Sequence, residues 1–200
     1  MTSPLSGLSW PVRTDRLSVR PARVEDLPAV GAYRRRPEVS RWLPTAPGTA
    51  EDHVAHISAK PERLEKTLVI ERDGAVIGDL FLSLEDAWAQ AEVVDRARGV
   101  QAEIGWCLDP AHQGRGYATE AVTELLRLCF EDLGLRRVVA NSFADNTASW
   151  RLMERLGMRR ETHTVRDSLH RSGEWLDGLG YALLTEEWTT TAPSPRRSRS

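Results

Sequence analysis

The chain has 200 residues, of which 40% are hydrophobic and 28% are charged, and these proportions are typical of a soluble globular domain. Acidic and basic residues number 29 and 27, so the net charge of −2 predicts no nucleic-acid partner. The two cysteines, Cys107 and Cys129, indicate no disulfide framework and suit a reducing compartment. The apolar runs fall short of the roughly 18 residues that a membrane span needs. We therefore expect a cytoplasmic protein with no signal peptide and no membrane association.

The first half of the chain is predicted to hold a strand, a group of helices and a hairpin. Residues 1–13 are interrupted by two prolines and a glycine and are expected to be an irregular lead-in. Thr49 and Asp52 form a capping-box pattern at the start of one helix. Asp73 and Gly74 predict a tight hairpin turn. The expected strands are 16–21, 67–71 and 75–84, and the expected helices are 25–35, 37–43 and 50–60.

The second half is predicted to alternate strands with amphipathic helices, after an acidic insertion at 85–99. The best helix pattern lies in 119–133, with apolar residues at Val122, Leu125, Leu126, Cys129 and Leu133. A second helix is expected between Asn146 and Gly157, and the expected strands are 101–108, 138–143, 158–165 and 175–184. Threonine, proline, serine and arginine dominate 189–200, which we expect to be a disordered tail. This order predicts one mixed α/β domain over residues 14–188.

The segment from His112 to Ala121 is the one most suggestive of chemistry. Gly114 and Gly116 precede the strongest helix, so the backbone can approach a ligand closely and the unpaired N–H groups of the helix start can bind phosphate. Arg115 could add a charged contact. The alternative is a glycine-rich turn that simply starts a helix. The segment lacks the lysine of a Walker A loop, and Thr119 replaces the last glycine of a dinucleotide-binding fingerprint.

A longer set of motifs surrounds this loop. Gln113, Gly116 and Ala118 match the pattern Gln/Arg-x-x-Gly-x-Gly/Ala, and further matches lie at 14–17, 20–21, 103–106, 108–110, 116–121, 146–149 and 156–158. Through these motifs, which span about residues 14–188, the chain resembles the GNAT superfamily of acyl-CoA-dependent N-acyltransferases. It is most similar to the RimJ/RimL-type branch, which acetylates ribosomal-protein N-termini. The resemblance implies an α/β (α+β mixed) fold, with one mostly antiparallel twisted sheet of six to seven strands that splays centrally and is flanked by helices.

The resemblance also implies where acetyl-CoA, the co-substrate, would bind. The backbone at Trp106, Cys107 and Leu108 would pair with the pantetheine arm, in the manner of an added strand. A backbone N–H near Leu108 would polarise the thioester carbonyl. The other residues implied in binding are Gln113, Gly114, Arg115, Gly116, Tyr117, Ala118, Thr119, Asn146 and Ser149. Neither the resemblance nor the five histidines, which lack a metal-ligand spacing, predict a metal.

Acyl transfer to an amine needs a base for the ammonium and a hydrogen-bond donor for the departing thiolate. The resemblance implies Glu103 as the base, with Asp167 as a second candidate, but either carboxylate could instead be a structural or surface charge. It implies Ser149 as the donor, because the tyrosine common in the family is absent from 144–156. Asn146 and Ser149 could equally cap a helix. Cys107 as an acyl-enzyme nucleophile has no base visible in the sequence, and a buried cysteine is the alternative.

The resemblance leaves the acceptor open between a protein N-terminal α-amine and a small-molecule amine. It implies an acceptor site built from 34–47, Trp88 with its loop, and 167–175, so that Trp42 and Trp175 would also lie near the entrance. Acetyl is the expected acyl group, with succinyl as an alternative. A homodimer through the late strands is expected. The rival class is a non-catalytic acyl-CoA-binding or regulatory module of the same fold.

Overall fold

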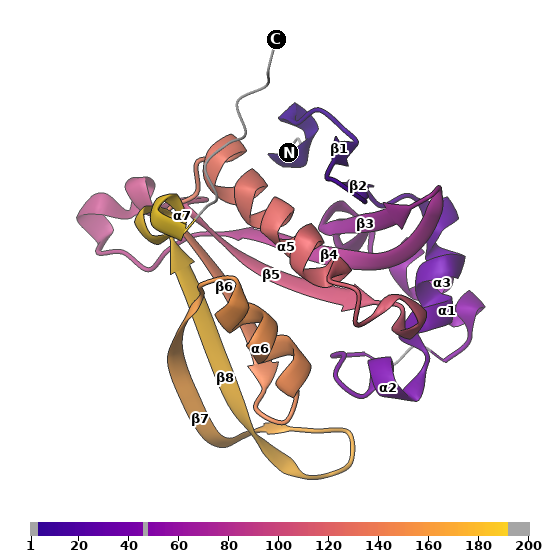
Figure 1. The fold of residues 1–200 in the computed structure, drawn as a ribbon. Coiled ribbons are helices and arrows are strands. Elements are labelled where there is room, and N and C mark those ends of the chain that lie inside the picture. The colour runs from indigo at the N-terminus through magenta and orange to yellow at the C-terminus, as the bar shows by residue number, and fades with distance from the viewer. Residues whose placement is uncertain (1–3, 46–47, 192–200) are drawn as a thin grey trace.

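A single sheet organises the computed structural model, which describes residues 4–45 and 48–191 (Figure 1). Within these residues the sheet has eight strands in the order β1-β2-β3-β4-β5-β6-β8-β7. Neighbouring strands run antiparallel except β5 and β6, which are parallel. The strands are β1 (Val12–Arg13), β2 (Ser18–Pro21), β3 (Thr67–Arg72), β4 (Ala75–Glu85), β5 (Gln101–Leu108), β6 (Arg137–Phe143), β7 (Arg159–Leu169) and β8 (Trp175–Leu184). The predicted mixed, mostly antiparallel α/β fold is therefore confirmed.

The strand beyond the expected six to seven is β1, which lies in the lead-in that we predicted to be irregular. The chain turns back at Thr14, whose N–H donates to the Leu17 carbonyl at 2.9 Å, and Val12 then pairs with Val19 of β2. Leu5, in the turn Pro4–Gly7, is buried in the main core. The prediction for 1–13 is therefore wrong at the turn Pro4–Gly7 and at β1, because pairing with the next strand along the chain compensates for weak local propensity, whereas residues 8–11 have no regular structure.

Helices cover both faces of the sheet. α5 (Tyr117–Arg127) and α6 (Thr147–Arg155) lie on one face, and the helices of the first half lie beside β3 and β4 (Figure 1). Those helices are α1 (Leu27–Arg34), α2 (Pro37–Ser40), α3 (Ala50–Ser58) and α4 (Pro61–Glu65), and α7 (Thr185–Thr191) follows β8. Short 3-10 turns cover Pro4–Gly7, Val24–Asp26, Ala91–Ala97 and Pro110–His112. None of the helices described in this structure has the length and apolar character of a membrane span.

The strongest predicted helix, 119–133, has different bounds in the structure. It begins two residues earlier because Gly116, at φ +81°, forms the N-cap, and its carbonyl accepts from the N–H of Glu120 at 3.0 Å. The regular α-helix ends at Arg127 and continues as a π-turn over Leu128–Asp132, where the Leu133 N–H reaches the Leu128 carbonyl at 2.9 Å. The start of this helix therefore lies directly against the glycine loop.

Two local predictions are confirmed. Asp73 and Gly74 turn the β3–β4 hairpin with φ angles of +50° and +80°, as a tight turn of this kind requires. Thr49 accepts from the Asp52 N–H at 3.0 Å, and the Asp52 carboxylate accepts from the Thr49 N–H at 2.7 Å, which completes the capping box of α3. Both features depend only on residues adjacent in the chain.

The tail predicted at 189–200 is corrected at its start. Residues 189–191 end α7 instead, because Trp188 anchors this helix. The indole of Trp188 is buried, stacks on Phe130 at 5.8 Å between ring centroids and donates to Glu131 at 3.0 Å. Residues 192–200 lie outside the described residues.

Candidate active site

The central strands β5 and β6 separate partway along their length. They pair only at Gln101 with Arg137, Ala102 with Val138, and Glu103 with Val139. Beyond that point β5 continues to Leu108 paired with β4 alone, and β6 continues to Phe143 paired with β8 alone. The sheet therefore opens at its centre, and the margin of β5 from 104 to 108 is left for an added strand.

Glu103 lies at the last paired position before the strands separate. Its carboxylate accepts from the side-chain amide of Asn141 on β6 at 3.1 Å. Ala102 and Ile104 point into the core that contains α5 and α6. Glu103 lies between them on the strand, so its side chain points to the opposite face of the sheet, and the bond to Asn141 joins β5 and β6 on that face. Sequence reasoning missed Asn141, although its two-residue spacing from Val139 and Phe143 places it on the same face of the strand. If Glu103 is instead a structural charge, the alternative that we weighed, its partner in the structure is the Asn141 amide.

The other predicted β5 residues follow the open margin. Cys107 and Leu108 are buried, and Trp106 is partly buried against the main core. The Leu108 carbonyl accepts from the Gln113 side chain at 3.2 Å, so Gln113 holds the end of β5 to the following loop. Gly78 of β4 faces this end, where a Cβ atom would lie 2.6 Å from the Cys107 carbonyl oxygen. Only glycine allows β4 to approach β5 so closely.

The predicted phosphate loop is exposed and adopts backbone angles suited to glycine. Gly114 has φ +74° and Gly116 has φ +81°, and a Cβ at Gly114 would meet nothing within 4 Å. Residues 113–116 are exposed, Tyr117 is buried, and Ala118 and Thr119 lie in the first turn of α5 with intermediate exposure. The first N–H groups of α5 therefore face a loop with no side-chain obstruction at either glycine, which suits a diphosphate.

Asn146 and Ser149 lie where β6 gives way to α6. Asn146 is the N-cap residue of α6, and its carbonyl accepts from the N–H of Ser149 at 3.0 Å. In the part of the chain that the structure describes, the Asn146 side chain makes no capping hydrogen bond. Among the described residues the structure therefore does not show the capping role that we weighed for the Asn146 side chain, and its contact with a ligand stays a prediction.

Asp167 lies on β7, in an irregular stretch between Thr164 and Ser168. It is exposed, accepts from the Ser168 hydroxyl at 3.0 Å and lies beside Gly178 of β8. Gly178 pairs with Phe143, whereas Gly180, two residues along β8, pairs with Asn141, the partner of Glu103. The two predicted base candidates therefore project from the same face of the sheet, with Glu103 at the splay and Asp167 nearer the edge.

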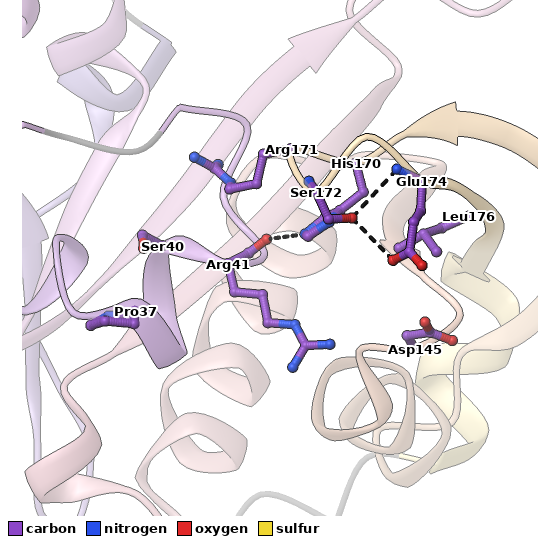
Figure 2. A pocket seen from close by; sticks show the side chains of 9 residues that line it. All are labelled: Pro37, Ser40, Arg41, Asp145, His170, Arg171, Ser172, Glu174 and Leu176. Atoms are coloured by element: carbon purple, nitrogen blue, oxygen red, sulfur yellow. Dashed lines mark hydrogen bonds between the residues drawn. The ribbon is translucent and has the colours of Figure 1, made fainter.

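An open groove of about 410 Å³ lies between α2, the β6–α6 turn and the β7–β8 loop (Figure 2). It is lined by Pro37, Ser40, Arg41, Asp145, His170, Arg171, Ser172, Glu174 and Leu176. His170 bonds to the Arg41 carbonyl at 2.9 Å, and its ring meets Phe143 edge-on at 5.5 Å and Trp42 at 5.9 Å. The predicted acceptor segments 34–47 and 167–175 therefore meet in one place over their described parts, and residues 46–47 lie outside the described residues.

Trp88 does not belong to this groove. Its insertion follows β4 at Glu85, which pairs with Gln101 at the start of β5, whereas the groove lies beyond the ends of β6 and α2. Trp88 is 89% exposed, and the structure places it away from the groove that the other two predicted acceptor segments share. Trp175 follows the groove residue Glu174 but is itself half exposed and does not line the groove. Strand connectivity, rather than residue type, placed the insertion at the far end of the sheet.

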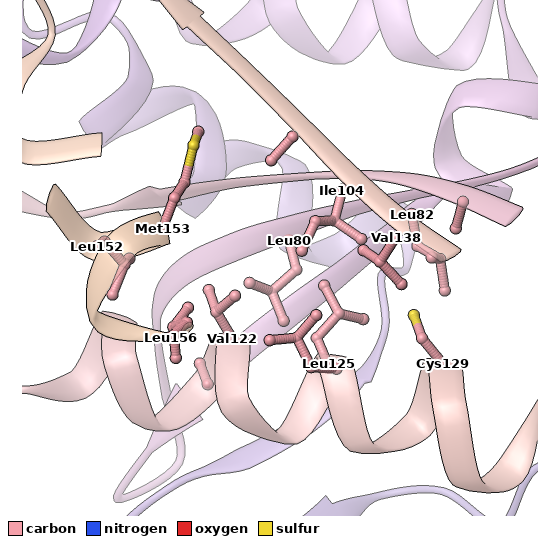
Figure 3. Close-up of a cluster of buried hydrophobic side chains, with 14 of the residues drawn as sticks. Leu80, Leu82, Ile104, Val122, Leu125, Cys129, Val138, Leu152, Met153 and Leu156 are labelled. Atoms are coloured by element: carbon pink, nitrogen blue, oxygen red, sulfur yellow. The ribbon is translucent and has the colours of Figure 1, made fainter. Parts of the chain in front are cut away.

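A well-packed core supports the strands under the splay (Figure 3). Val122 and Leu125 of α5, Cys129 of the π-turn that continues it, Leu152 and Met153 of α6 and its C-cap residue Leu156 belong to the same core as Leu80, Ile104 and Val138 of the sheet. These α5 residues are those expected from helical spacing. Because the core holds β4, β5 and β6 from one face, the separation of β5 and β6 is part of the folded state. Among the described residues, no group of three or more histidine, cysteine, aspartate or glutamate side chains could hold a metal ion.

Comparisons with known proteins agree with this geometry. A family model described as the acetyltransferase (GNAT) domain matches residues 16–159. The chain is 33% identical over 179 residues to the uncharacterized N-acetyltransferase YnaD of Bacillus subtilis (strain 168), covering 88% of this chain and 98% of that protein. A shorter match, 33% identical over 86 residues, covers 43% of this chain and 44% of the ribosomal protein uS5 alanine N-acetyltransferase of Escherichia coli (strain K12).

A solved structure extends the agreement to the fold. The GNAT-family acetyltransferase from Bacillus anthracis matches with a TM-score of 0.73 and 28% identity, covering 88% of this chain and 98% of that one. The central splay, the glycine loop at the start of α5 and the family match across residues 16–159 thus lead to one conclusion: the chain belongs to the GNAT family of N-acetyltransferases.

Proposed function

We propose that this enzyme transfers an acetyl group from acetyl-CoA directly to a primary amine, with both substrates bound at once. The observation that supports this most strongly is the opening between β5 and β6, which begins beyond Glu103. On one side β5 leads to the glycine loop, and on the other side β6 leads to the turn that lines the groove. A thioester held along β5 could be reached by an amine from the groove. Direct attack needs no acyl-enzyme intermediate and therefore no nucleophilic side chain.

In this proposal the backbone does most of the binding of CoA. The N–H groups of Gly114 to Ala118 bind the diphosphate, and the margin of β5 at Trp106 to Leu108 pairs with the pantetheine amides. Gln113 holds the loop to the end of β5, and Arg115, Tyr117 and Thr119 complete its surroundings. A backbone N–H at Leu108 stabilises the tetrahedral oxyanion, and such a donor lowers the barrier by on the order of 3 kcal/mol.

In this proposal one side chain accepts a proton from the amine, and another donates a hydrogen bond to the leaving group. Glu103 accepts the proton of the incoming ammonium, directly or through water, while Asn141 holds its carboxylate in place. Ser149 donates a hydrogen bond to the departing CoA thiolate, and Asn146 orients a pantetheine amide or a water. Asp167 is the alternative base, because it projects from the same sheet face closer to the β7–β8 loop.

The acceptor enters through the groove. Its lining offers both signs of charge, with Arg41 and Arg171 beside Asp145 and Glu174, which suits an amine that carries further polar groups. An N-terminal peptide fits an open groove of this kind, and the similarity to an enzyme named for acetylating ribosomal protein uS5 supports a protein N-terminus over a free small amine. The exposed edge strand β7 is the surface through which we expect a homodimer, and we place the reaction in the cytoplasm.

The first experiment separates binding from turnover. Calorimetry with coenzyme A should give a clear binding signal, and Gly116→Glu should abolish it by placing a carboxylate against the diphosphate. A peptide and amine screen with acetyl-CoA, read out by free-thiol release, should then find an acceptor. No heat with coenzyme A would contradict the proposal, and binding without thiol release for any amine would indicate a binding module.

The role of Glu103 has its own test. Glu103→Gln should lower kcat by about 100-fold, the usual effect of losing a general base, while the Kd for coenzyme A stays unchanged. Asp167→Asn distinguishes the two candidates under the same conditions. If Asp167→Asn lowers kcat and Glu103→Gln does not, the base is Asp167 and the assignment of Glu103 is wrong.

A further inference from the structure

A cluster of polar contacts joins the N-terminal segment to the first turn of α5. The Glu120 carboxylate accepts from the Thr14 hydroxyl at 2.5 Å, from the Arg16 backbone N–H at 2.9 Å and from Arg16 Nε at 2.7 Å. Arg16 Nη2 lies 2.6 Å from Oε2 of Glu120, the oxygen that also accepts from Nε, so two guanidinium nitrogens converge on one carboxylate oxygen. Glu120 is only 16% exposed, so this carboxylate is satisfied almost entirely by residues more than 100 positions away in the chain.

The same guanidinium also reaches the glycine loop. Arg16 Nη1 donates to the Arg115 carbonyl at 2.9 Å, and a Cβ added at Gly116 would lie 3.4 Å from Arg16 Nη2. The guanidinium carbon lies 4.6 Å from the centre of the Tyr117 ring, and Arg72 lies 5.0 Å from that centre. One side chain thus bridges the first turn of α5 and the loop that precedes it.

The contact with the Arg115 carbonyl has a direct consequence for the loop. The Arg115 carbonyl and the Gly116 N–H belong to one planar trans peptide, so they point in opposite directions. When Arg16 holds the carbonyl on its own side, the Gly116 N–H is turned away from Arg16. Gly116, at positive φ, has no side chain that could fix its orientation through packing. The hydrogen bond from Arg16 to the Arg115 carbonyl therefore limits the directions in which the Gly116 N–H can point.

The charges of the cluster also favour a bound phosphate at the glycine loop. An acidic group in the first turn of a helix would repel a bound phosphate, and the Arg16 guanidinium offsets the charge of Glu120. Burial acts to raise the pKa of Glu120, yet the hydrogen bonds from Thr14 and Arg16 keep it below its ordinary value. The lowered pKa favours the ionised carboxylate, which is the form that pairs with Arg16.

We propose that Arg16 is a positioning residue for the CoA loop: through Glu120 and the Arg115 carbonyl, it orients the Gly116 peptide toward the diphosphate. This inference rests on the proposed CoA site. It predicts an effect on donor binding, because the loop contacts CoA far from the reacting carbonyl. It also predicts that a positive charge at position 16 is not enough to orient the loop, because the contacts to Glu120 and to the Arg115 carbonyl need the several donors of a planar guanidinium.

The experiment measures the Kd for coenzyme A by calorimetry and the kinetics of acetyl transfer. Arg16→Gln should raise the Kd for coenzyme A and the KM for acetyl-CoA by about tenfold, with kcat nearly unchanged. Arg16→Lys keeps the charge but not the bridge and should resemble Arg16→Gln. Glu120→Gln should also weaken binding, and combining it with Arg16→Gln should add little because both changes break one unit. Arg13→Gln, on the exposed side of β1, is the matched control and should bind normally.

The outcomes separate the two proposals. Normal binding by Arg16→Gln, or full recovery with Arg16→Lys, would overturn the positioning role. Thermal unfolding of each variant checks that the fold is kept, and Arg16 is half exposed, so its loss removes little buried surface. If Gly116→Glu also leaves coenzyme A binding intact, the loop is not the diphosphate site, and the proposed function rather than the role of Arg16 has failed.

Discussion

Cys107 lies on the central strand next to the proposed oxyanion donor, where a reactive thiol would change the mechanism. Burial, and the Asp79 carboxylate on the neighbouring strand, raise the pKa of the Cys107 thiol well above its ordinary value. Asp79 is itself held by the Tyr33 hydroxyl at 2.6 Å and by Arg34 Nε at 3.0 Å. Because the thiolate is the reactive form, we expect Cys107 to act as a small apolar core residue rather than as a nucleophile.

Cys107→Ala should therefore keep kcat within about threefold of the parent enzyme and cost about 1 kcal/mol of stability. Cys129→Ala is the matched control, because burial alone raises the pKa of that thiol to about 12 and because Cys129 lies in the core at the π-turn after α5, not on β5. Steady-state kinetics and urea unfolding measure the two effects. A 100-fold loss of kcat in Cys107→Ala alone would restore the acyl-enzyme mechanism.

At the scale of elements, an ion cluster ties β7 to β6 across the strand between them. Glu161 of β7 accepts from Arg137 Nη1 of β6 at 3.1 Å and from Arg159 Nη2 at 2.6 Å. The hydrogen bond from Arg137 dominates, and together with Arg159 it lowers the pKa of Glu161 to about 2, against the effect of burial. The folded-state pKa is thus below the unfolded one, so the stabilisation is present above the ordinary pKa of about 4.5 and is lost as pH falls toward 2.

When the pH is lowered from 7 to 3, the free energy of unfolding should consequently fall less for Glu161→Gln than for the parent protein. The expected difference is about 0.5–1 kcal/mol, because solvent only partly screens the Arg137–Glu161 ion pair. Urea unfolding at several pH values measures this difference. Glu92→Gln, in the exposed turn before β5, provides the control and should follow the parent curve. Equal acid sensitivity of Glu161→Gln and the parent would show that the cluster does not stabilise the edge of the sheet.

At the scale of the molecule, the groove depends on three segments that are far apart in sequence. The end of α2, the end of β6 and the β7–β8 loop meet around His170, which bonds to the Arg41 carbonyl and to the Ser172 hydroxyl, each at 2.9 Å. Arg171 also donates to the Leu43 carbonyl. These contacts hold the β7–β8 loop against α2 and shape the place where we propose that the acceptor enters.

His170→Ala should weaken the contact between the β7–β8 loop and α2. It should therefore raise the KM for the acceptor by about tenfold, while the Kd for coenzyme A stays unchanged. His163→Ala is the matched control, because His163 lies on the exposed strand β7, pairs with Asp177 of β8 and does not line the groove. Acceptor titration and calorimetry measure the two quantities. Weaker coenzyme A binding by His170→Ala would show that the loop supports the donor site instead.

Features that depend on neighbours in the chain were readable from the sequence. The Asp73-Gly74 turn, the Thr49–Asp52 capping box and the apolar stripe of α5 each follow from local geometry, and so does the glycine loop before that helix. Together with the motifs that resemble the GNAT family, they sufficed to predict the fold class and the chemistry.

Features that depend on distant contacts required the tertiary structure. The Glu103–Asn141 bond exists only because β5 and β6 lie side by side, and the bridge from Arg16 to Glu120 joins residues 104 positions apart. The exposed position of Trp88 follows from strand order, which no local pattern contains. The reason is physical: a local motif is determined by the few dihedral angles of its own residues, whereas a site between strands is determined by how the whole sheet packs.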